Sequence, residues 1–500
     1  MKHRLLVIIL LLSISLSAAI IDKNYTIVIP ISTKNKIELQ YNKLAANLFQ
    51  EGIFKSTGIK LNIVFENKYK GTKAIFIGNT IAANKVGINI NNFKYNQACA
   101  KSDGKGNLYI VGRYVADVHY GHATSHKFHE IATLRGVCEF LREHVNMRVF
   151  LPGKKGRVFS KKNIIQFDDN LNKKYTPSFS YVIGRPGTDP IYDIANGYLS
   201  APWYKTYGGH SHPVAIPLSL YNKHPEYFIL TSKGKRWKGL QYCISNKDVQ
   251  ELIYKEMLKQ LDLGYEWVQL AQTDGFSKCA CQPCKKLFNT NDYGEKLWIL
   301  HLNLALRLKK DRPGKKVVIL SYPPTGDVPK TFKDFPDNVI IEICKYDSKK
   351  FKEWQKVKVP GSFVVYVYNW GVYHPSSFSP SFSIEDSINQ VKEFLSNNIK
   401  GIYKCGFGEM FGLCGPDYYA YGYAINHKGN ANSKDILDDY CNFLYGKAAN
   451  EMKEFHLLLY SRLKLNLKQK HDNYHQNLQG KCLLDTQIIN CLIYVILKIF

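Results

Sequence analysis

Residues 265–275, YEWVQLAQTDG, form an apolar run that ends in a carboxylate and a glycine. Similar runs recur at residues 178–185, 315–324, 338–347, 362–370 and 401–409, and amphipathic segments with helical spacing lie between several of them. Apolar strands that alternate with helices predict a parallel sheet buried on both faces. We therefore expect residues 173–430 to form an α/β domain, a (β/α)8 barrel of the TIM type. No glycine-rich loop follows any of the runs, which argues against a nucleotide-binding sheet.

Two further segments flank the predicted barrel. Strand and helix patterns alternate over residues 20–172, which predicts a small N-terminal α/β domain. Residues 431–465 have helical spacing, and we expect a C-terminal helical segment there. We assign no structure to the tail at residues 466–500, which is polar at first and apolar at its end.

The N-terminus has the pattern of a secretory signal peptide. Lys2 and Arg4 precede an apolar run, and small residues follow it up to Ala19. We expect residues 1–19 to be removed and the protein to be exported to the periplasm, the cell surface or the medium. The apolar run is shorter than the roughly 20 residues that a membrane span needs, so we expect no stable membrane span.

The chain is basic, with a formal net charge of +27. Its lysines and arginines are spread along the sequence, and no nucleic-acid-binding motif accompanies them. We therefore expect no nucleic-acid partner. An exported basic protein is better suited to acidic polysaccharides or to an anionic cell surface.

Carboxylates stand near the ends of the predicted strands, where a barrel has its active site. They are Asp274, Glu342, Asp347 and Glu409. Glycoside hydrolysis uses two carboxyl groups, one as acid and one as base or nucleophile. Each of these residues could instead cap a helix or form a salt bridge, and the pattern does not identify the pair.

Aromatic and imidazole side chains near the same strand ends suit a sugar-binding cleft. Tyr368 and Trp370 end one strand, and His212 lies in a glycine-rich loop. These three residues are candidates for substrate contact.

Three cysteines, Cys279, Cys281 and Cys284, follow Asp274 closely, and Cys243 could join them. Four thiolates would form a closed structural zinc site, whereas an exported protein could also pair them as disulfides. Both alternatives stiffen the loop behind Asp274. We expect no catalytic metal or cofactor, because three thiolates are rarely the ligands of a catalytic zinc.

Longer motifs resemble a known family. Residues 224–249, 272–284 and 443–452 are similar to bacterial proteins of the domain of unknown function 4838 family, whose architecture resembles that of the family 67 α-glucuronidases. The resemblance implies an N-terminal domain like that of β-hexosaminidases, followed by the barrel and C-terminal helices.

The resemblance also implies roles for individual residues. Asp274 occupies the place of the family's catalytic acid, a glutamate, and is one methylene shorter. Lys345 and Asp347 correspond to a lysine and an aspartate near a later strand end, and Glu409 is the competing second carboxylate. Arg185 or Lys345 would hold the carboxylate of a uronic acid through charge-assisted hydrogen bonds.

These observations together predict a secreted glycoside hydrolase that acts on an oligosaccharide or polysaccharide. A more specific prediction is a substrate that contains uronic acid. Asp274 would be the general acid, and Asp347 or Glu409 would activate water. The alternative is a catalytically inactive carbohydrate-binding or surface protein on the same fold.

Overall fold

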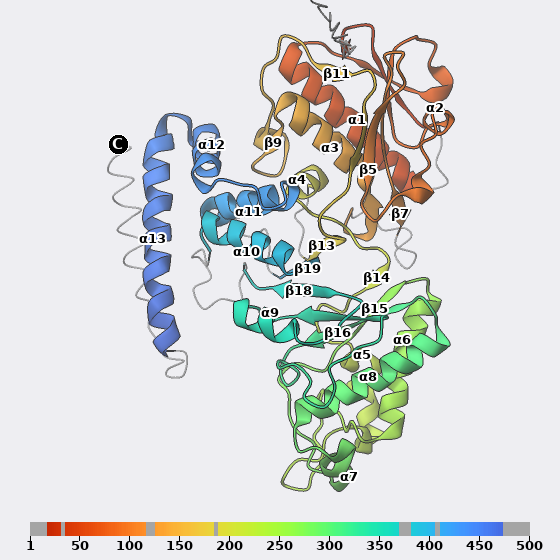
Figure 1. Ribbon diagram of the computed structural model, residues 1–500, viewed down its shortest axis with the longest axis vertical. Helices are drawn as coiled ribbons and strands as arrows, with labels where there is room; N and C mark the ends of the chain where they lie inside the picture. Colours follow the sequence, from red (N-terminus) through yellow and green to blue (C-terminus); the bar gives the residue numbers. More distant parts are fainter. Residues whose placement is uncertain are drawn as a thin grey trace, which may run out of the picture. The chain divides into compact units, whose positions relative to one another are not determined.

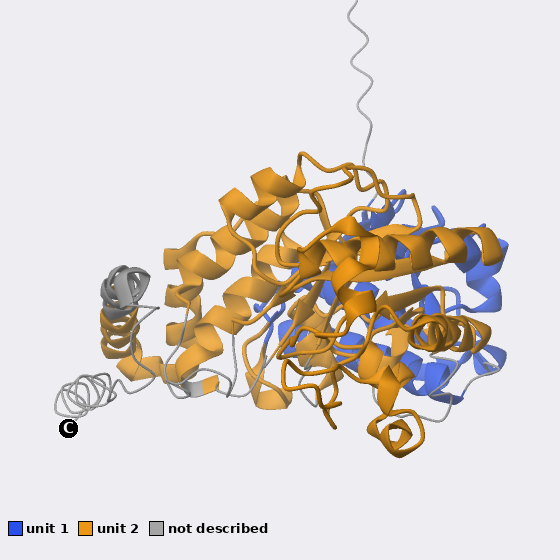
Figure 2. Ribbon diagram, turned by 90° about the horizontal axis from the view of Figure 1, so that it is seen from below, with its two compact units in different colours: residues 1–114, 131–148, 158–176 blue, residues 115–130, 149–157, 177–500 orange. Residues whose placement is uncertain are grey.

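A computed structural model of the chain describes residues 18–31, 36–116, 126–184, 189–369, 382–405 and 411–473, with the backbone alone at residue 412 and over 462–473. The chain divides into two compact units, shown in blue and orange in Figure 2. Unit 1 comprises Met1–Tyr114, Ile131–Arg148 and Val158–Thr176. Unit 2 comprises Val115–Glu130, Val149–Arg157 and Pro177–Phe500.

Unit 1 is built on a six-stranded mixed sheet with the order β12-β5-β6-β4-β2-β3. Its strands are β2 (Thr26–Ile29), β3 (Asn62–Phe65), β4 (Ala74–Ile77), β5 (Ala98–Ser102), β6 (Leu108–Gly112) and β12 (Asn172–Tyr175). The strands β3, β2, β4 and β6 run parallel, whereas β5 pairs antiparallel with β6 and β12. A separate antiparallel pair joins β1 (Ala18–Ile20) to β11 (Gln166–Asp168).

The helices of unit 1 are α1 (Lys36–Thr57), α2 (Ile81–Lys85) and α3 (Ala132–Val145). Helix α1 packs on α3, and Phe49 and Phe140 meet in this interface with ring centroids 5.6 Å apart. Asn146 caps the C-terminal end of helix α3, and its positive φ of 49° is a conformation that asparagine tolerates well. The predicted α/β character of this segment is confirmed.

Four short strands lie where the chain passes from one unit to the other. They are β7 (Tyr114–Ala116), β8 (His129–Ile131), β9 (Arg148–Val149) and β10 (Arg157–Val158), and they form two two-stranded sheets, β7 with β8 and β9 with β10.

Unit 2 contains a seven-stranded sheet with the order β13-β19-β18-β17-β16-β15-β14, in which every neighbouring pair is parallel (Figure 1). Its strands are β13 (Tyr181–Gly184), β14 (Tyr204–Lys205), β15 (Trp267–Leu270), β16 (Lys316–Ser321), β17 (Val339–Ile343), β18 (Phe363–Val367) and β19 (Ile399–Lys404). Consecutive strands are neighbours from β14 to β19, and the first strand, β13, then lies beside the last. This cyclic order is that of a barrel, whereas an open doubly wound sheet reverses its strand order near the middle. The predicted α/β class with a barrel-type parallel sheet is confirmed.

The helices of unit 2 are α4 (Pro190–Ala195), α5 (His212–Ala215), α6 (Lys247–Asp262), α7 (Gln282–Lys286), α8 (Tyr293–Asp311), α9 (Ser348–Trp354), α10 (Ile384–Ser396), α11 (Phe411–Asn426), α12 (Ser433–Tyr445) and α13 (Ala449–Asn473). Side-chain caps fix where several of them begin: Asn246 caps α6, Asp292 caps α8, and Ser383 forms a capping box with Asp386 at α10. Helix α10 packs against α11, and α12 packs against α13 (Figure 1). Over the described residues, no helix has the length and apolar character of a membrane span.

Candidate functional site

Asp274 lies in the turn that follows strand β15. Strand β15 ends at Leu270, and the buried Gln272 anchors the following residues by donating to the Tyr322 carbonyl (2.5 Å) and to Thr325 Oγ1 (2.7 Å). Asp274 is exposed, and its Oδ1 accepts a hydrogen bond from the backbone N–H of Gly275 at 2.9 Å. Gly275 has a φ of +59°, in the left-handed region that glycine adopts without a steric penalty. The turn therefore presents the carboxylate at the carboxyl end of the strand.

A tyrosine from the next strand holds this carboxylate. Tyr322 directly follows β16, and its hydroxyl donates to Asp274 Oδ1 at 3.0 Å. Partial burial, together with the hydrogen bond to Asp274 and its negative charge, raises the pKa of Tyr322 to about 12. The phenol therefore stays protonated and remains a donor at neutral pH.

Aromatic rings from β18 and β19 lie at the same edge of the sheet. Tyr366 stacks on Tyr403, with ring centroids 4.6 Å apart and an interplanar angle of 10°, and it contacts Tyr368 at 4.8 Å. Tyr368 is 41% exposed, so part of its ring is open to a ligand. His210 packs edge-on against Tyr322 at 5.8 Å, and its Nδ1 lies 2.7 Å from the Gln272 carbonyl oxygen.

A second carboxyl group, that of Glu342, is fully buried on a strand of the sheet. It belongs to β17, is 0% exposed, and its Oε2 accepts a hydrogen bond from Gln269 Nε2 at 2.5 Å. Desolvation raises the pKa of Glu342 to about 7, although the hydrogen bond from Gln269 opposes this shift. Within the described part of the chain, Oε1 has no hydrogen-bond partner. Burial therefore favours the protonated, neutral form of Glu342.

Gln269 connects Glu342 to the loop of residues 206–210. Its Oε1 accepts hydrogen bonds from the backbone N–H groups of Tyr207 (2.9 Å) and Gly209 (3.3 Å). On the other side of this loop, the Gly208 carbonyl accepts a hydrogen bond from the Tyr366 hydroxyl at 3.2 Å. One buried amide thus ties the carboxyl inside the sheet to the loop that carries His210.

A cavity of about 220 Å³ lies beside this loop, near the edge strands β13 and β14. Its lining includes two lysines, Lys127 and Lys205, and four tyrosines, Tyr198, Tyr204, Tyr265 and Tyr403. Tyr403 also stacks on Tyr366, so the cavity wall and the aromatic rings at the sheet edge share a residue. The two lysines make the cavity suitable for an anionic group.

The structure places the other predicted site residues differently. Lys345 and Asp347 follow β17 and are exposed, and Asp347 is the N-cap of α9, where its Oδ1 accepts from the Lys350 N–H at 2.7 Å. Arg185, Trp370 and Glu409 lie outside the described residues. Their roles stay predictions.

His212 is buried, with only 2% of its surface exposed. Its Nε2 lies 3.3 Å from the Nε2 of His301 in α8, and the two rings meet edge to face. Burial, followed by the charge of His210, lowers the pKa of His212 to about 3, and burial lowers the pKa of His301 as well. Both imidazoles are neutral, and in this loop the histidine that borders the exposed edge is His210.

Sequence patterns did not single out Tyr322, Tyr366 or Tyr403 as site residues. Tyr322 had one available signal, because it directly follows an apolar strand just as the predicted candidates do. Tyr366, which is buried, and Tyr403 lie within their strands, and a strand pattern does not show which rings stack on one another.

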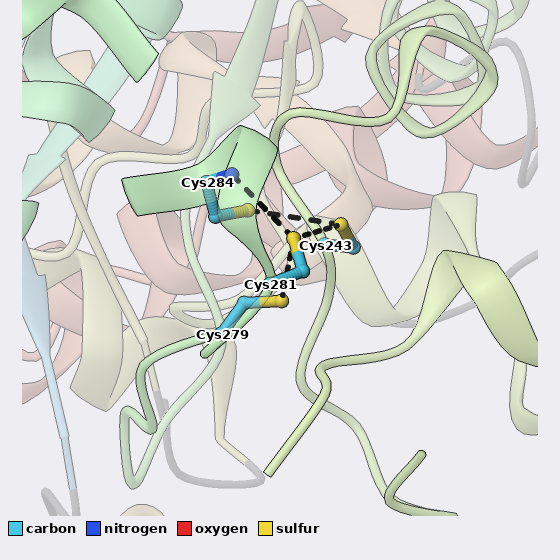
Figure 3. Close-up of side chains that lie close together, drawn as sticks. All are labelled: Cys243, Cys279, Cys281 and Cys284. Atoms are coloured by element: carbon cyan, nitrogen blue, oxygen red, sulfur yellow. Dashed lines mark hydrogen bonds between the residues drawn. The ribbon is translucent and has the colours of Figure 1, made fainter. Parts of the chain in front are cut away.

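Four buried cysteines, Cys243, Cys279, Cys281 and Cys284, come together next to this site, and we call them the cysteine cluster. Figure 3 shows their sulfur atoms pointing toward one another, with Cys284 on helix α7. All four sulfurs lie within 4.8 Å of each other, so the cluster could hold a metal ion.

Solved structures provide the first comparison. The chain is similar to a family GH115 4-O-methyl-α-glucuronidase with specificity for decorated arabinogalactans, at 12% identity and a TM-score of 0.53, over 88% of this chain and 62% of that one. It also matches a chitobiase of Flavobacterium johnsoniae at 11% identity and a TM-score of 0.44, over 93% of this chain and 75% of that one. A family 89 glycoside hydrolase from Clostridium perfringens, solved with PUGNAc, matches at 10% identity and a TM-score of 0.41, over 85% of this chain and 53% of that one.

The likeness to the GH115 enzyme shows that this chain has the fold of a glycoside hydrolase. The chain spans 62% of the length of that enzyme. None of the curated proteins matches this chain. The model of one family, the domain of unknown function DUF4838, matches residues 152–456, which is more than half of the chain, and the protein therefore belongs to the DUF4838 family.

Proposed function

We propose that the protein is an exported glycoside hydrolase that acts on a polysaccharide, with Asp274 as its general acid. The observation that carries this proposal is the exposed Asp274 carboxylate at the carboxyl end of β15, held by the Tyr322 hydroxyl at 3.0 Å. The carboxyl ends of the strands are where enzymes with a barrel of this kind have their active sites.

The surroundings of Asp274 suit a sugar ring. Tyr368 offers a partly exposed aromatic face, and tyrosine combines an apolar ring with a polar hydroxyl. His210 adds an imidazole at the same edge. The second carboxyl of the reaction is Asp347 or Glu409, as the family resemblance implies, and it would activate water.

An acidic sugar is the substrate class that the charges favour. The chain has a net charge of +27, Lys345 is exposed at the end of β17, and Lys127 and Lys205 line the cavity next to the site. Lysines bind carboxylates by charge-assisted hydrogen bonds. We therefore propose uronic-acid-containing polysaccharides as substrates, with Lys345 or Arg185 at the uronate carboxylate.

A panel of oligosaccharides, with and without uronic acid, tests this proposal on the purified chain. Wild-type protein should release sugar from a uronic-acid substrate, and Asp274→Asn should reduce kcat by about 10²–10⁴-fold, the usual contribution of a general acid. Asp337→Asn is a matched control, because this exposed aspartate precedes β17 and so lies at the amino end of that strand. Full turnover by Asp274→Asn would rule out the assignment.

A second candidate function is carbohydrate binding without catalysis. Two observations favour it: Glu342 is fully buried, and the carboxylate of Asp347 is used as a helix cap. In that case calorimetry would show that wild type and Asp274→Asn bind the same oligosaccharide, while neither releases product from any substrate of the panel.

A further inference from the structure

We propose that the cysteine cluster binds one zinc ion as a closed tetrathiolate site, and that this ion fixes the backbone that carries Asp274. The inference concerns metal binding and loop structure, so it does not depend on the proposed glycosidase activity.

Distances between the sulfur atoms fit a tetrahedral ion. Cys279 Sγ lies 3.4 Å from Cys281 Sγ, and Cys243 Sγ lies 3.6 Å from Cys281 Sγ and 3.7 Å from Cys284 Sγ. Four sulfurs at about 2.3 Å from a tetrahedral zinc are about 3.8 Å apart. A disulfide would bring two of them to about 2.05 Å. These three distances are close to the spacing of ligands around a common ion and well above a disulfide bond length.

The four cysteine ligands limit the type of metal centre that the cluster can hold. Thiolates are soft ligands, and a tetrahedral set of four is typical of zinc or of iron–sulfur sites. With every position occupied by cysteine, no site for water or substrate remains, so such a zinc would be structural.

Polar groups around the cluster would orient and stabilise thiolate ligands. The Leu230 N–H donates to Cys279 Sγ at 3.3 Å, and the Cys284 N–H donates to Cys281 Sγ at 3.4 Å. Ser245 Oγ lies 3.1 Å from Cys284 Sγ. Outer hydrogen bonds of this kind accompany metal ligands and tune their basicity.

A buried cation also lies next to the cluster. Lys296 is 2% exposed, and its ammonium group donates to the backbone carbonyls of Cys284 and Lys285, the latter at 2.8 Å. Burying a charge is costly unless an opposite charge compensates it. The net negative charge of a zinc tetrathiolate would provide this compensation.

The cluster joins two segments that are distant in the sequence, and one of them holds the Asp274 turn. Cys243 comes two residues after Gln241, whose Nε2 donates to the carbonyls of Asp274 (2.7 Å) and Gly275 (3.1 Å). The Oε1 of Gln241 accepts from the Ser277 N–H at 3.2 Å. A metal that bridges Cys243 to the three later cysteines would keep Gln241 in register with residues 274–277.

Metal analysis of the full chain, purified without chelator, tests the proposal directly. We expect one equivalent of zinc per chain, and we expect Cys281→Ser and Cys284→Ser to lose it. Cys441→Ser is the matched control, because Cys441 is also fully buried but lies in α12, away from the cluster. Retention of a full equivalent of zinc by the cluster variants would overturn the assignment.

Wild-type protein alone supplies a second readout, should the variants not fold. Chain refolded with Co²⁺ should show the intense thiolate-to-cobalt absorption of a tetrahedral sulfur site, and zinc should abolish it. Thiols counted in denaturant with chelator and without reductant should include all four cluster cysteines. A count short by two or four thiols would establish a disulfide, and stoichiometric iron would establish a different centre; both results contradict the proposal.

Hydrogen exchange tests the link to Asp274. Removal of zinc should speed amide exchange over residues 274–284, while strands β16 and β17 keep their protection. Unchanged exchange in this loop after zinc loss would refute the structural role of the ion.

Discussion

Two regions of unit 2 contain carboxyl and imidazole groups in different surroundings. One is the carboxyl end of the sheet, where side chains are exposed, and the other is a set of buried groups made of Glu342 in β17, His212 in α5 and His301 in α8. At the edge, Asp274 is exposed and hydrogen-bonded to the Tyr322 hydroxyl. The buried groups Glu342, His212 and His301 have lost nearly all contact with water. Burial disfavours the charged form of each group, so the carboxyl inside tends to be neutral and the imidazoles stay unprotonated. Access to water, rather than residue type, therefore decides which of these groups a ligand can reach and which groups make the stability of the protein depend on pH.

The largest expected effect concerns the buried imidazoles in acid. His212 has a folded-state pKa of about 3 against an ordinary value of 6.5. Between these values the unfolded chain binds a proton that the folded chain does not, so the stability present above pH 6.5 is lost as the pH falls toward 3. This loss amounts to about 5 kcal/mol for His212 over the whole window.

Urea unfolding between pH 7 and pH 4.5 measures this effect. Over that interval the free energy of unfolding should fall in both proteins. In the double variant His212→Leu/His301→Leu the fall should be smaller than in wild type by at least about 3 kcal/mol. Equal pH dependence of the two proteins would show that the pair is not buried as described.

Glu342 should give the opposite sign at higher pH. Its folded-state pKa is about 7 and its ordinary value is 4.5. In this window the folded chain holds a proton that the unfolded chain has released, so stability is present below pH 4.5 and is lost as the pH rises to about 7. The expected loss is about 3 kcal/mol.

Glu342→Gln keeps the shape of the side chain and removes this titration. Between pH 5 and pH 8 the free energy of unfolding of Glu342→Gln should change less than that of wild type. Most of the difference between the two proteins should arise below pH 7. Parallel stability curves for the two proteins would contradict a buried, neutral carboxyl at this position.

Sequence patterns predicted the parallel sheet because apolar runs and helical segments alternate regularly, and the cyclic strand order confirms it. They also brought Asp274 to attention, because the carboxyl ends of parallel strands share one edge. They could not predict that Tyr322 hydrogen-bonds to Asp274 or that Gln241 holds its backbone, since both contacts join residues more than 30 positions apart. Nor could they separate Asp347, whose carboxylate caps α9, from a catalytic carboxylate, because a cap and an active-site acid can follow a strand in the same way.

The smallest effect compares one hydrogen bond in each region. Tyr322→Phe removes the donor to Asp274 at the exposed edge, where water can replace it, and should cost at most about 1 kcal/mol of unfolding free energy. Gln269→Met removes the donor to Glu342 and leaves a buried carboxyl without its partner, so it should cost about 1–3 kcal/mol. Chemical denaturation at pH 7 gives both values.

Because Gln269 also holds the loop of residues 206–210, amide exchange at Tyr207 and Gly209 should rise in Gln269→Met and stay unchanged in Tyr322→Phe. If the two variants were equally destabilised, water would reach Glu342 as readily as Asp274, and the distinction between the exposed strand ends and the buried groups would fail.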